Sequence, residues 1–191
     1  MNANANMVLA IVIALIVGIV LGALAIQLFQ QARTRRLKEH FGPEYGRAVA
    51  ETGNRSRAEA MLEHRRRRVE QLQIRTLEPT ERARFQEGWR DVQARFVDNP
   101  GGAVTDADRL VGEVMSAEGY PMLEFEQRAA DISVDHPVVI ENYREAHNIA
   151  LQSAQGHAST EDLRRAMIHC RRLFEELVGQ AEYPQTERIQ L

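Results

Sequence analysis

Cysteine and lysine are almost absent from this 191-residue chain, which contains one of each, Cys170 and Lys38. A single cysteine excludes a disulfide within the chain and a zinc or iron–sulfur site built from several cysteines. Lys38 lies in the segment Arg-Arg-Leu-Lys-Glu-His, which is neither a P-loop nor an apolar pocket suited to a Schiff base. The motifs G-x-G-x-x-G, G-x-S-x-G and H-E-x-x-H are also missing. The sequence therefore predicts no cofactor and no metal ion.

An excess of positive charge is missing as well. The chain has 24 basic and 27 acidic side chains, for a net charge of -3 at pH 7. Proteins that bind nucleic acid over a broad surface are usually basic. The composition therefore argues against a nucleic-acid partner.

Charged residues are missing from the first 32 positions. Within them, an apolar run from Met7 to Leu28 contains one polar side chain, Gln27. Twenty helical residues extend roughly 30 Å, which is the thickness of the hydrocarbon core of a bilayer. The run predicts a transmembrane helix over residues 7–28, preceded by a short extracytoplasmic N-terminus over residues 1–6.

Basic residues follow the apolar run and none precedes it, which favours an N-terminus outside the cell and a C-terminal domain in the cytoplasm, at the inner membrane. These flanking residues are Arg33, Arg35, Arg36 and Lys38. They are also placed to meet anionic lipid headgroups. A cleaved signal peptide is the alternative, since Ala23-Leu24-Ala25 resembles a cleavage site, but a signal peptide has its basic residues before the apolar run.

Small residues recur every fourth position in the apolar run. They are Ala10, Ala14, Gly18 and Gly22. Such a face lets two helices approach closely in lipid, so it predicts a homodimer. The alternative is that alanine and glycine are simply common in membrane helices.

Helical periodicity characterises the rest of the chain, and no stretch alternates as a strand does. We expect an all-α fold, with a juxtamembrane stalk over residues 29–41, a soluble domain of about six helices over residues 42–178 and a tail over residues 179–191. Gly42-Pro43 should end the first helix. Further helices are expected over residues 43–49, 56–73, 79–96, 100–119, 122–131, 137–153 and 160–178. The spacing of Phe85, Trp89, Val92 and Phe96 predicts the centre of the core.

The pattern V-D-x-P occurs twice, at residues 97–100 and 134–137. Proline suits the first position of a helix, so Asn99 and His136 are expected as N-caps, with the preceding aspartates near the positive ends of two helix dipoles.

The second copy also suggests a catalytic or metal-binding site made of Asp135, His136, Tyr143 and His147. Neighbours on one short segment rarely point at one another, and the two histidines are about three helical turns apart, which is too far for one ion on one straight helix. The structural interpretation, helix capping, is therefore preferred.

Four consecutive arginines, Arg65 to Arg68, suggest a nucleic-acid patch. Consecutive residues spread around most of a helix, and Glu59, Glu63 and Glu70 lie within reach of them on the same helix. An ion-paired, solvated helix is the preferred interpretation, and contact with the membrane or an acidic partner comes next.

Three segments carry a resemblance to known sequences: residues 41–45 (Phe-Gly-Pro-Glu-Tyr), residues 89–100 and residues 127–137. In these segments the chain resembles a family of small bacterial proteins with one N-terminal apolar segment, described as hypothetical, membrane or secreted proteins. The resemblance covers roughly residues 37–178 and implies no activity, cofactor or site residues.

Together these patterns predict a membrane-anchored helical scaffold or interaction module, with the lipid bilayer and a protein as its partners. An enzyme using Asp135, His136, Tyr143 and His147 is the alternative, followed by a nucleic-acid binder using Arg65 to Arg68.

Overall fold

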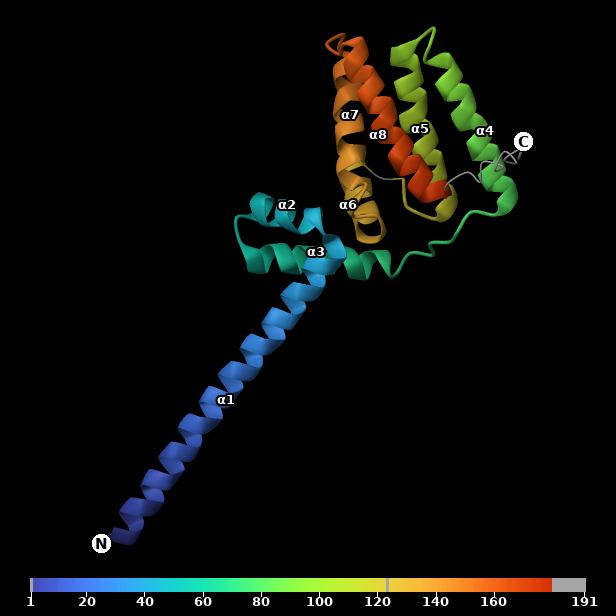
Figure 1. Ribbon diagram of the computed structural model, residues 1–191. Coiled ribbons are helices and arrows are strands. Elements are labelled where there is room, and N and C mark those ends of the chain that lie inside the picture. The colour runs from blue at the N-terminus through green and yellow to red at the C-terminus, as the bar shows by residue number, and fades with distance from the viewer. Residues whose placement is uncertain (1, 123, 180–191) are drawn as a thin grey trace, which may run out of the picture. The chain divides into compact units, whose positions relative to one another are not determined.

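The computed structural model describes residues 2–122 and 124–179, and for residues 2–14 it describes the backbone only. In these ranges the chain forms eight helices and no strand, so the predicted all-α fold is confirmed (Figure 1). The helices are α1 (Asn2–Phe41), α2 (Pro43–Thr52), α3 (Arg55–Val69), α4 (Pro79–Arg95), α5 (Pro100–Glu118), α6 (Phe125–Asp135), α7 (Ile140–Ala154) and α8 (Thr160–Val178). The predicted tail lies outside the described residues, apart from Gly179.

Helix α1 is continuous from the apolar run into the predicted stalk. It ends where expected, because Gly42 adopts a φ of 48° and Pro43 cannot donate a helical hydrogen bond. The chain divides into two units, Met1–His40 and Phe41–Leu191.

Helices α2 and α3 form a hairpin. Pro43 occupies the first turn of α2, and Gly53 ends that helix in the left-handed conformation. The side chain of Asn54 then accepts a hydrogen bond from the backbone N–H of Arg57 and caps α3. These local signals explain the tight turn between the two helices.

Helices α4, α5, α7 and α8 form the bundle, with α5 between α4 and α8 and with α7 beside α8 (Figure 1). Its core draws on α4 to α8 and contains the predicted Phe85, Trp89 and Val92, whereas Phe96 is only partly buried. Trp89 stacks on Phe174 of α8, with 4.8 Å between the ring centroids.

The buried apolar side chains of the α2–α3 hairpin, among them Ala48, Ala58 and Leu62, lie outside this core cluster. The hairpin packs on the bundle through α3 and α6. The hairpin is therefore attached to the bundle partly by contacts that lie outside the main hydrophobic core.

The first V-D-x-P copy behaves as predicted: the Asn99 side chain accepts a hydrogen bond from the N–H of Gly102 and caps α5. The prediction for the second copy is wrong. Buried residues continue in α6 as far as Val134 and the helix runs to Asp135, so His136 ends α6 instead of starting α7. Residues 137–139 form a turn, and α7 begins at Ile140 rather than at Pro137.

Some helix bounds differ from expectation. Helix α6 covers Phe125–Asp135 instead of residues 122–131, and α3 ends at Val69 instead of residue 73. Seven helices follow α1 in the described residues, in line with the seven ranges expected. The bounds of α8 are as predicted, because Ser159 and Asp162 form a capping box at its start.

Candidate functional site

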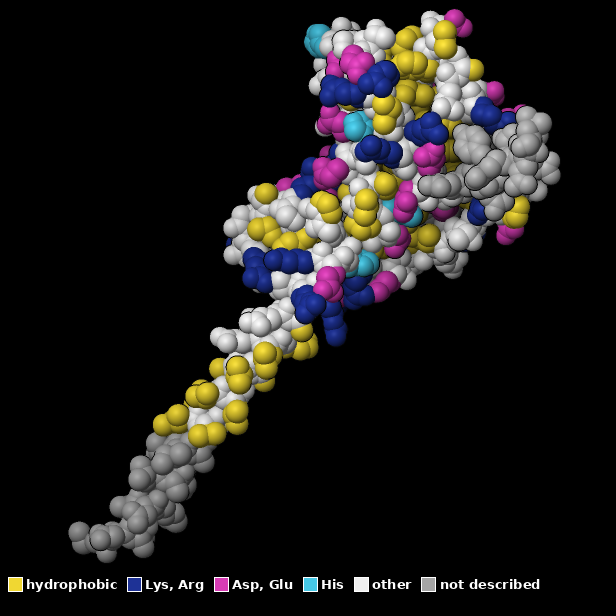
Figure 2. Space-filling model, viewed as in Figure 1, with side chains coloured by type: hydrophobic (Ala, Val, Ile, Leu, Met, Phe, Trp, Pro, Cys, Tyr) yellow, Lys and Arg dark blue, Asp and Glu magenta, His cyan; other side chains and the backbone are white. Residues whose placement is uncertain are grey.

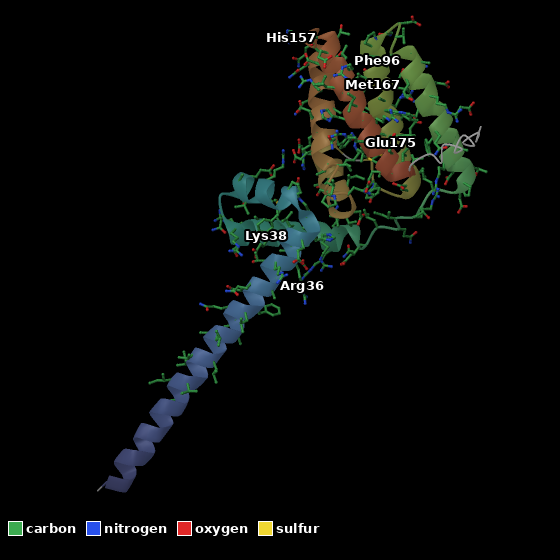
Figure 3. The ribbon with its side chains drawn as sticks, in the orientation of Figure 1. Arg36, Lys38, Phe96, His157, Met167 and Glu175 are labelled. Atoms are coloured by element: carbon green, nitrogen blue, oxygen red, sulfur yellow. The ribbon has the colours of Figure 1, made fainter. Side chains whose placement is uncertain are left out.

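Helix α1 is the one helix among the described residues that is long and apolar enough to cross a membrane. Its large apolar side chains from Leu15 to Phe29 are exposed, as Figure 2 shows in yellow. The predicted flanking residues are exposed on the same helix, and Figure 3 labels two of them. They are Arg33, Arg35, Arg36 and Lys38.

Open space lies beside Gly18 and Gly22, since no atom other than those of neighbouring residues and the helix's own backbone lies within 4 Å of a Cβ placed at either residue. The other two members of the predicted dimer face, Ala10 and Ala14, have side chains outside the described part of the structure. The exposed glycines leave a face of α1 that a second helix can approach.

The four-arginine run on α3 is ion-paired throughout. Arg65 donates to Glu44, Arg68 donates to Asp131 at 2.5 Å, and both Arg66 and Arg67 pair with Glu63. The pairs with Arg66 and Arg67 hold the pKa of Glu63 well below its usual range, at about 2, and the hydrogen bond from Arg66 is the largest cause. The run therefore has partners within the domain and forms no unpaired basic stripe.

Glu44 is the centre of a buried charge network. Its side chain is 1% exposed and accepts hydrogen bonds from Arg65 at 3.0 Å and from both terminal nitrogens of Arg144 at 2.6 and 2.9 Å. Arg144 also reaches Glu141 at 3.3 Å. Because Glu44 lies on α2, Arg65 on α3 and Arg144 on α7, this network ties the hairpin to the bundle.

The side chains of Asp135 and His136 contact different residues. The hydroxyl of Tyr120 donates to Asp135 at 2.6 Å, and the Nδ1 atom of His136 lies 3.3 Å from Glu176 of α8. Neither contact involves Tyr143 or His147. Asp135 and His136 therefore have separate partners, and neither forms a hydrogen bond with the other candidate catalytic residues.

Tyr143 and His147 do lie together, one turn apart on α7, against the ring of Phe125. Phe125 stacks on His147 at 3.6 Å and meets Tyr143 at 5.0 Å between centroids. The guanidinium of Arg128 lies 5.9 Å from the Tyr143 ring centroid, and Asp108 of α5 acts electrostatically on both Tyr143 and His147. Helices α5, α6 and α7 therefore build one partly buried polar cluster.

Four atoms of this cluster are buried without a hydrogen-bond partner: Oδ1 of Asp108, Nε of Arg128, the hydroxyl of Tyr143 and Nδ1 of His147. Burial lowers the pKa of His147 and raises the pKa of Tyr143. The histidine is thus neutral at pH 7, and the cluster offers donors and acceptors that a buried water molecule would satisfy.

Two other ionisable groups are shifted by burial. The pKa of Glu118 is raised to about 7, mainly by loss of hydration, and one of its carboxylate oxygens has no hydrogen-bond partner. Burial likewise raises the pKa of the Cys170 thiol to about 12. A protonated thiol that is 1% exposed is a poor nucleophile, which agrees with the inward position of Cys170 on α8.

A shallow groove of about 200 Å³ lies between α4 and α8. Its apolar lining includes Trp89, Phe96, Met167 and Ile168, and Arg164 and Arg171 flank it. Sequence reasoning placed Phe96 in the core and so missed the groove. The clue to the groove is that Phe96 follows the last residue of α4, where neighbouring helices no longer cover its side chain.

The described part of the chain holds no group of three or more histidine, cysteine or acidic side chains arranged to bind a metal ion. Its fold and its sites define an all-α protein with one helix able to span a membrane. Comparison with models of protein families, with curated proteins and with solved structures gives no match. The resemblance drawn from the three sequence segments therefore stays a prediction.

Proposed function

We propose that this protein is a single-span bacterial inner-membrane protein whose helical domain serves as an anchored scaffold or protein-interaction module in the cytoplasm. The observation that carries the proposal is the exposed apolar surface of α1, followed directly by exposed basic side chains. In water, an exposed apolar strip of this length is costly, whereas in a bilayer it is matched to its surroundings. The basic residues on its C-terminal side favour a cytoplasmic domain.

The separation of the candidate catalytic residues supports an interaction module over an enzyme. A general acid–base or nucleophilic mechanism needs its groups within hydrogen-bond reach of one another or of a common substrate. Asp135 and His136 instead contact Tyr120 and Glu176. The Tyr143–His147 cluster shares no hydrogen bond with them in the described residues.

The pairing of Arg65 to Arg68 supports a protein partner over nucleic acid. Each guanidinium already meets a carboxylate of the same domain. A phosphate backbone would compete with these carboxylates for the arginines, and the overall charge of -3 gives no compensating attraction.

Cysteine labelling tests the topology. The sole native thiol, Cys170, is buried, so introduced cysteines can be labelled in the otherwise unchanged chain. With a membrane-impermeant maleimide, Asn4→Cys should react in intact cells, and His157→Cys, an exposed position, only after the membrane is opened. The reverse pattern would refute the orientation, and a mature chain lacking the first 25 residues would show a cleaved signal peptide instead.

Photo-crosslinking in intact cells tests the interaction role. A photoreactive amino acid is placed at exposed positions on three faces of the bundle, for example at Arg90, Glu113 and Leu151. A scaffold should give a discrete adduct from one face and none from the others. Uniformly absent adducts in a correctly inserted protein would contradict the proposal.

A further inference from the structure

The groove between α4 and α8 is too small for an ordinary small-molecule ligand. Its volume of about 200 Å³ lies below the roughly 300 to 1,000 Å³ of such sites. Figure 3 labels Phe96 and Met167 on its two walls, and Figure 2 shows hydrophobic side chains gathered in the same region. A groove of this size suits one or two inserted side chains of a peptide segment.

The edges of the groove are basic. Arg164 and Arg171 flank it, with side chains 56% and 46% exposed. Arg164 pairs with Glu161 and Arg171 with Glu175 along α8, so a carboxylate arriving from elsewhere would extend existing pairs. A matching segment therefore carries apolar residues between acidic ones.

Residues 182–187, which lie outside the described part of the chain, have this composition. Tyr183 and Pro184 lie between Glu182 and Glu187. Proline disfavours the helical conformation in the residue before it, so Tyr183 favours an extended backbone. The segment is thus suited to lie along a groove rather than to continue α8.

The conformation of Gly179 allows the chain to leave the axis of α8. This residue follows the last residue of α8 with a φ of 82°, in a region that favours glycine. From Gly179, Arg171 lies about 12 Å back along the helix and Ile168 about 16 Å back, at 1.5 Å per residue. An extended chain covers about 3.3 Å per residue, so the backbone of Glu182 reaches about 10 Å, within side-chain length of Arg171, and the backbone of Pro184 reaches about 16 Å.

We propose that the α4–α8 groove binds the C-terminal segment of the same chain, residues 182–187. Tyr183 and Pro184 occupy the apolar floor beside Met167 and Ile168. Glu182 then lies near Arg171, and Glu187 near Arg164, about 22 Å back from Gly179 along α8. The segment covers apolar surface that the bundle otherwise leaves open to water. This inference does not depend on the membrane topology or on the proposed scaffold role.

Disulfide cross-linking in the full chain tests the proposal. Ile168, which is 38% exposed, is changed to cysteine and combined in turn with a cysteine at positions 182 to 185. The matched control places the first cysteine at Glu176, an exposed position of α8 that does not line the groove and is closer to Gly179. If the segment is held in the groove, disulfides within one chain should form about tenfold faster for Ile168→Cys than for Glu176→Cys, whereas a freely moving tether reacts at least as fast at position 176.

The products also identify the occupant. Differently tagged chains are mixed before oxidation, so disulfides between chains are distinguished from disulfides within one chain. Disulfides only between chains would show that a second copy fills the groove and would overturn the proposal. Rates equal to or below those of the Glu176→Cys control would overturn it as well.

A charge exchange tests the proposed register. Glu187→Arg should slow the cross-link between positions 168 and 183, and adding Arg164→Glu should restore it. Unchanged cross-linking in Glu187→Arg would refute the pairing of Glu187 with Arg164. If the segment were held only by apolar contacts with the floor of the groove, the double variant would not restore the cross-link.

Discussion

Replacing Glu44 by glutamine should release the α2–α3 hairpin from the bundle. Glutamine keeps the size of the side chain but removes the charge that faces Arg65 and Arg144. Arg144 is 6% exposed, so the change leaves a buried cation whose remaining ion pair is with the exposed Glu141. Breaking a buried pair in this way costs about 3 to 5 kcal/mol.

The loss should appear first as local opening. Because the apolar residues of the hairpin lie outside the main core, α2 and α3 can separate while α4 to α8 stay folded. Hydrogen exchange followed by mass spectrometry should show faster exchange in peptides from residues 43–69 and little change in those from α8. If opening is instead global, the midpoint of thermal unfolding should fall by about 2 to 4 °C for each kcal/mol.

The matched control is Glu141→Gln, which removes another carboxylate near Arg144. Glu141 has a side chain that is 48% exposed, so its pair with Arg144 is worth about 1 kcal/mol or less. Equal effects of Glu44→Gln and Glu141→Gln would refute the reasoning, because they would show that burial of Glu44 adds nothing to the network.

Three further predictions concern other groups. The pKa of Glu118 is raised from 4.5 to about 7 on folding, so its contribution to stability is complete below pH 4.5 and is lost as the pH rises through 7. In denaturant titrations at different pH values, Glu118→Gln should reduce this pH dependence of the unfolding free energy by about 2 to 3 kcal/mol. An unchanged profile would contradict the assignment. The pKa of His147 is lowered from 6.5 by burial, so folding stability should fall as the pH drops below 6.5, and His147→Gln should remove that part of the fall in the same titrations. Gly18→Leu combined with Gly22→Leu should abolish self-association of α1 in a membrane reporter assay, because bulky side chains keep two helices apart; undiminished association would exclude this face.

The parts of the fold that local chemistry decides were predictable from the sequence. Helix α8 follows from its repeating apolar positions and from the Ser159–Asp162 capping box, and both of its ends agree with the prediction. The break at Gly42-Pro43 follows from proline and glycine alone. The prediction for the second V-D-x-P copy was wrong because the same local pattern fits both the turn that follows a helix and the start of a new helix.

The candidate sites were harder to predict, because their members come from different helices. Tyr143 and His147 were identified from their sequence neighbourhood, but Asp108 and Arg128 join them only through the packing of α5 and α6. Similarly, nothing local links Glu44 to Arg144, which lie 100 residues apart. Such partners become visible only when tertiary contacts are known.

The ionic attachment of the α2–α3 hairpin has a mechanical consequence. In chain order the hairpin stands between the apolar helix and the bundle, so in the proposed membrane-anchored protein any tension between membrane and bundle is carried through it. The hydrogen bonds of its buried pairs act only over a short distance, so they resist small displacements and give way abruptly once separated. Under load the hairpin would therefore yield first and lengthen the tether while the bundle stays intact.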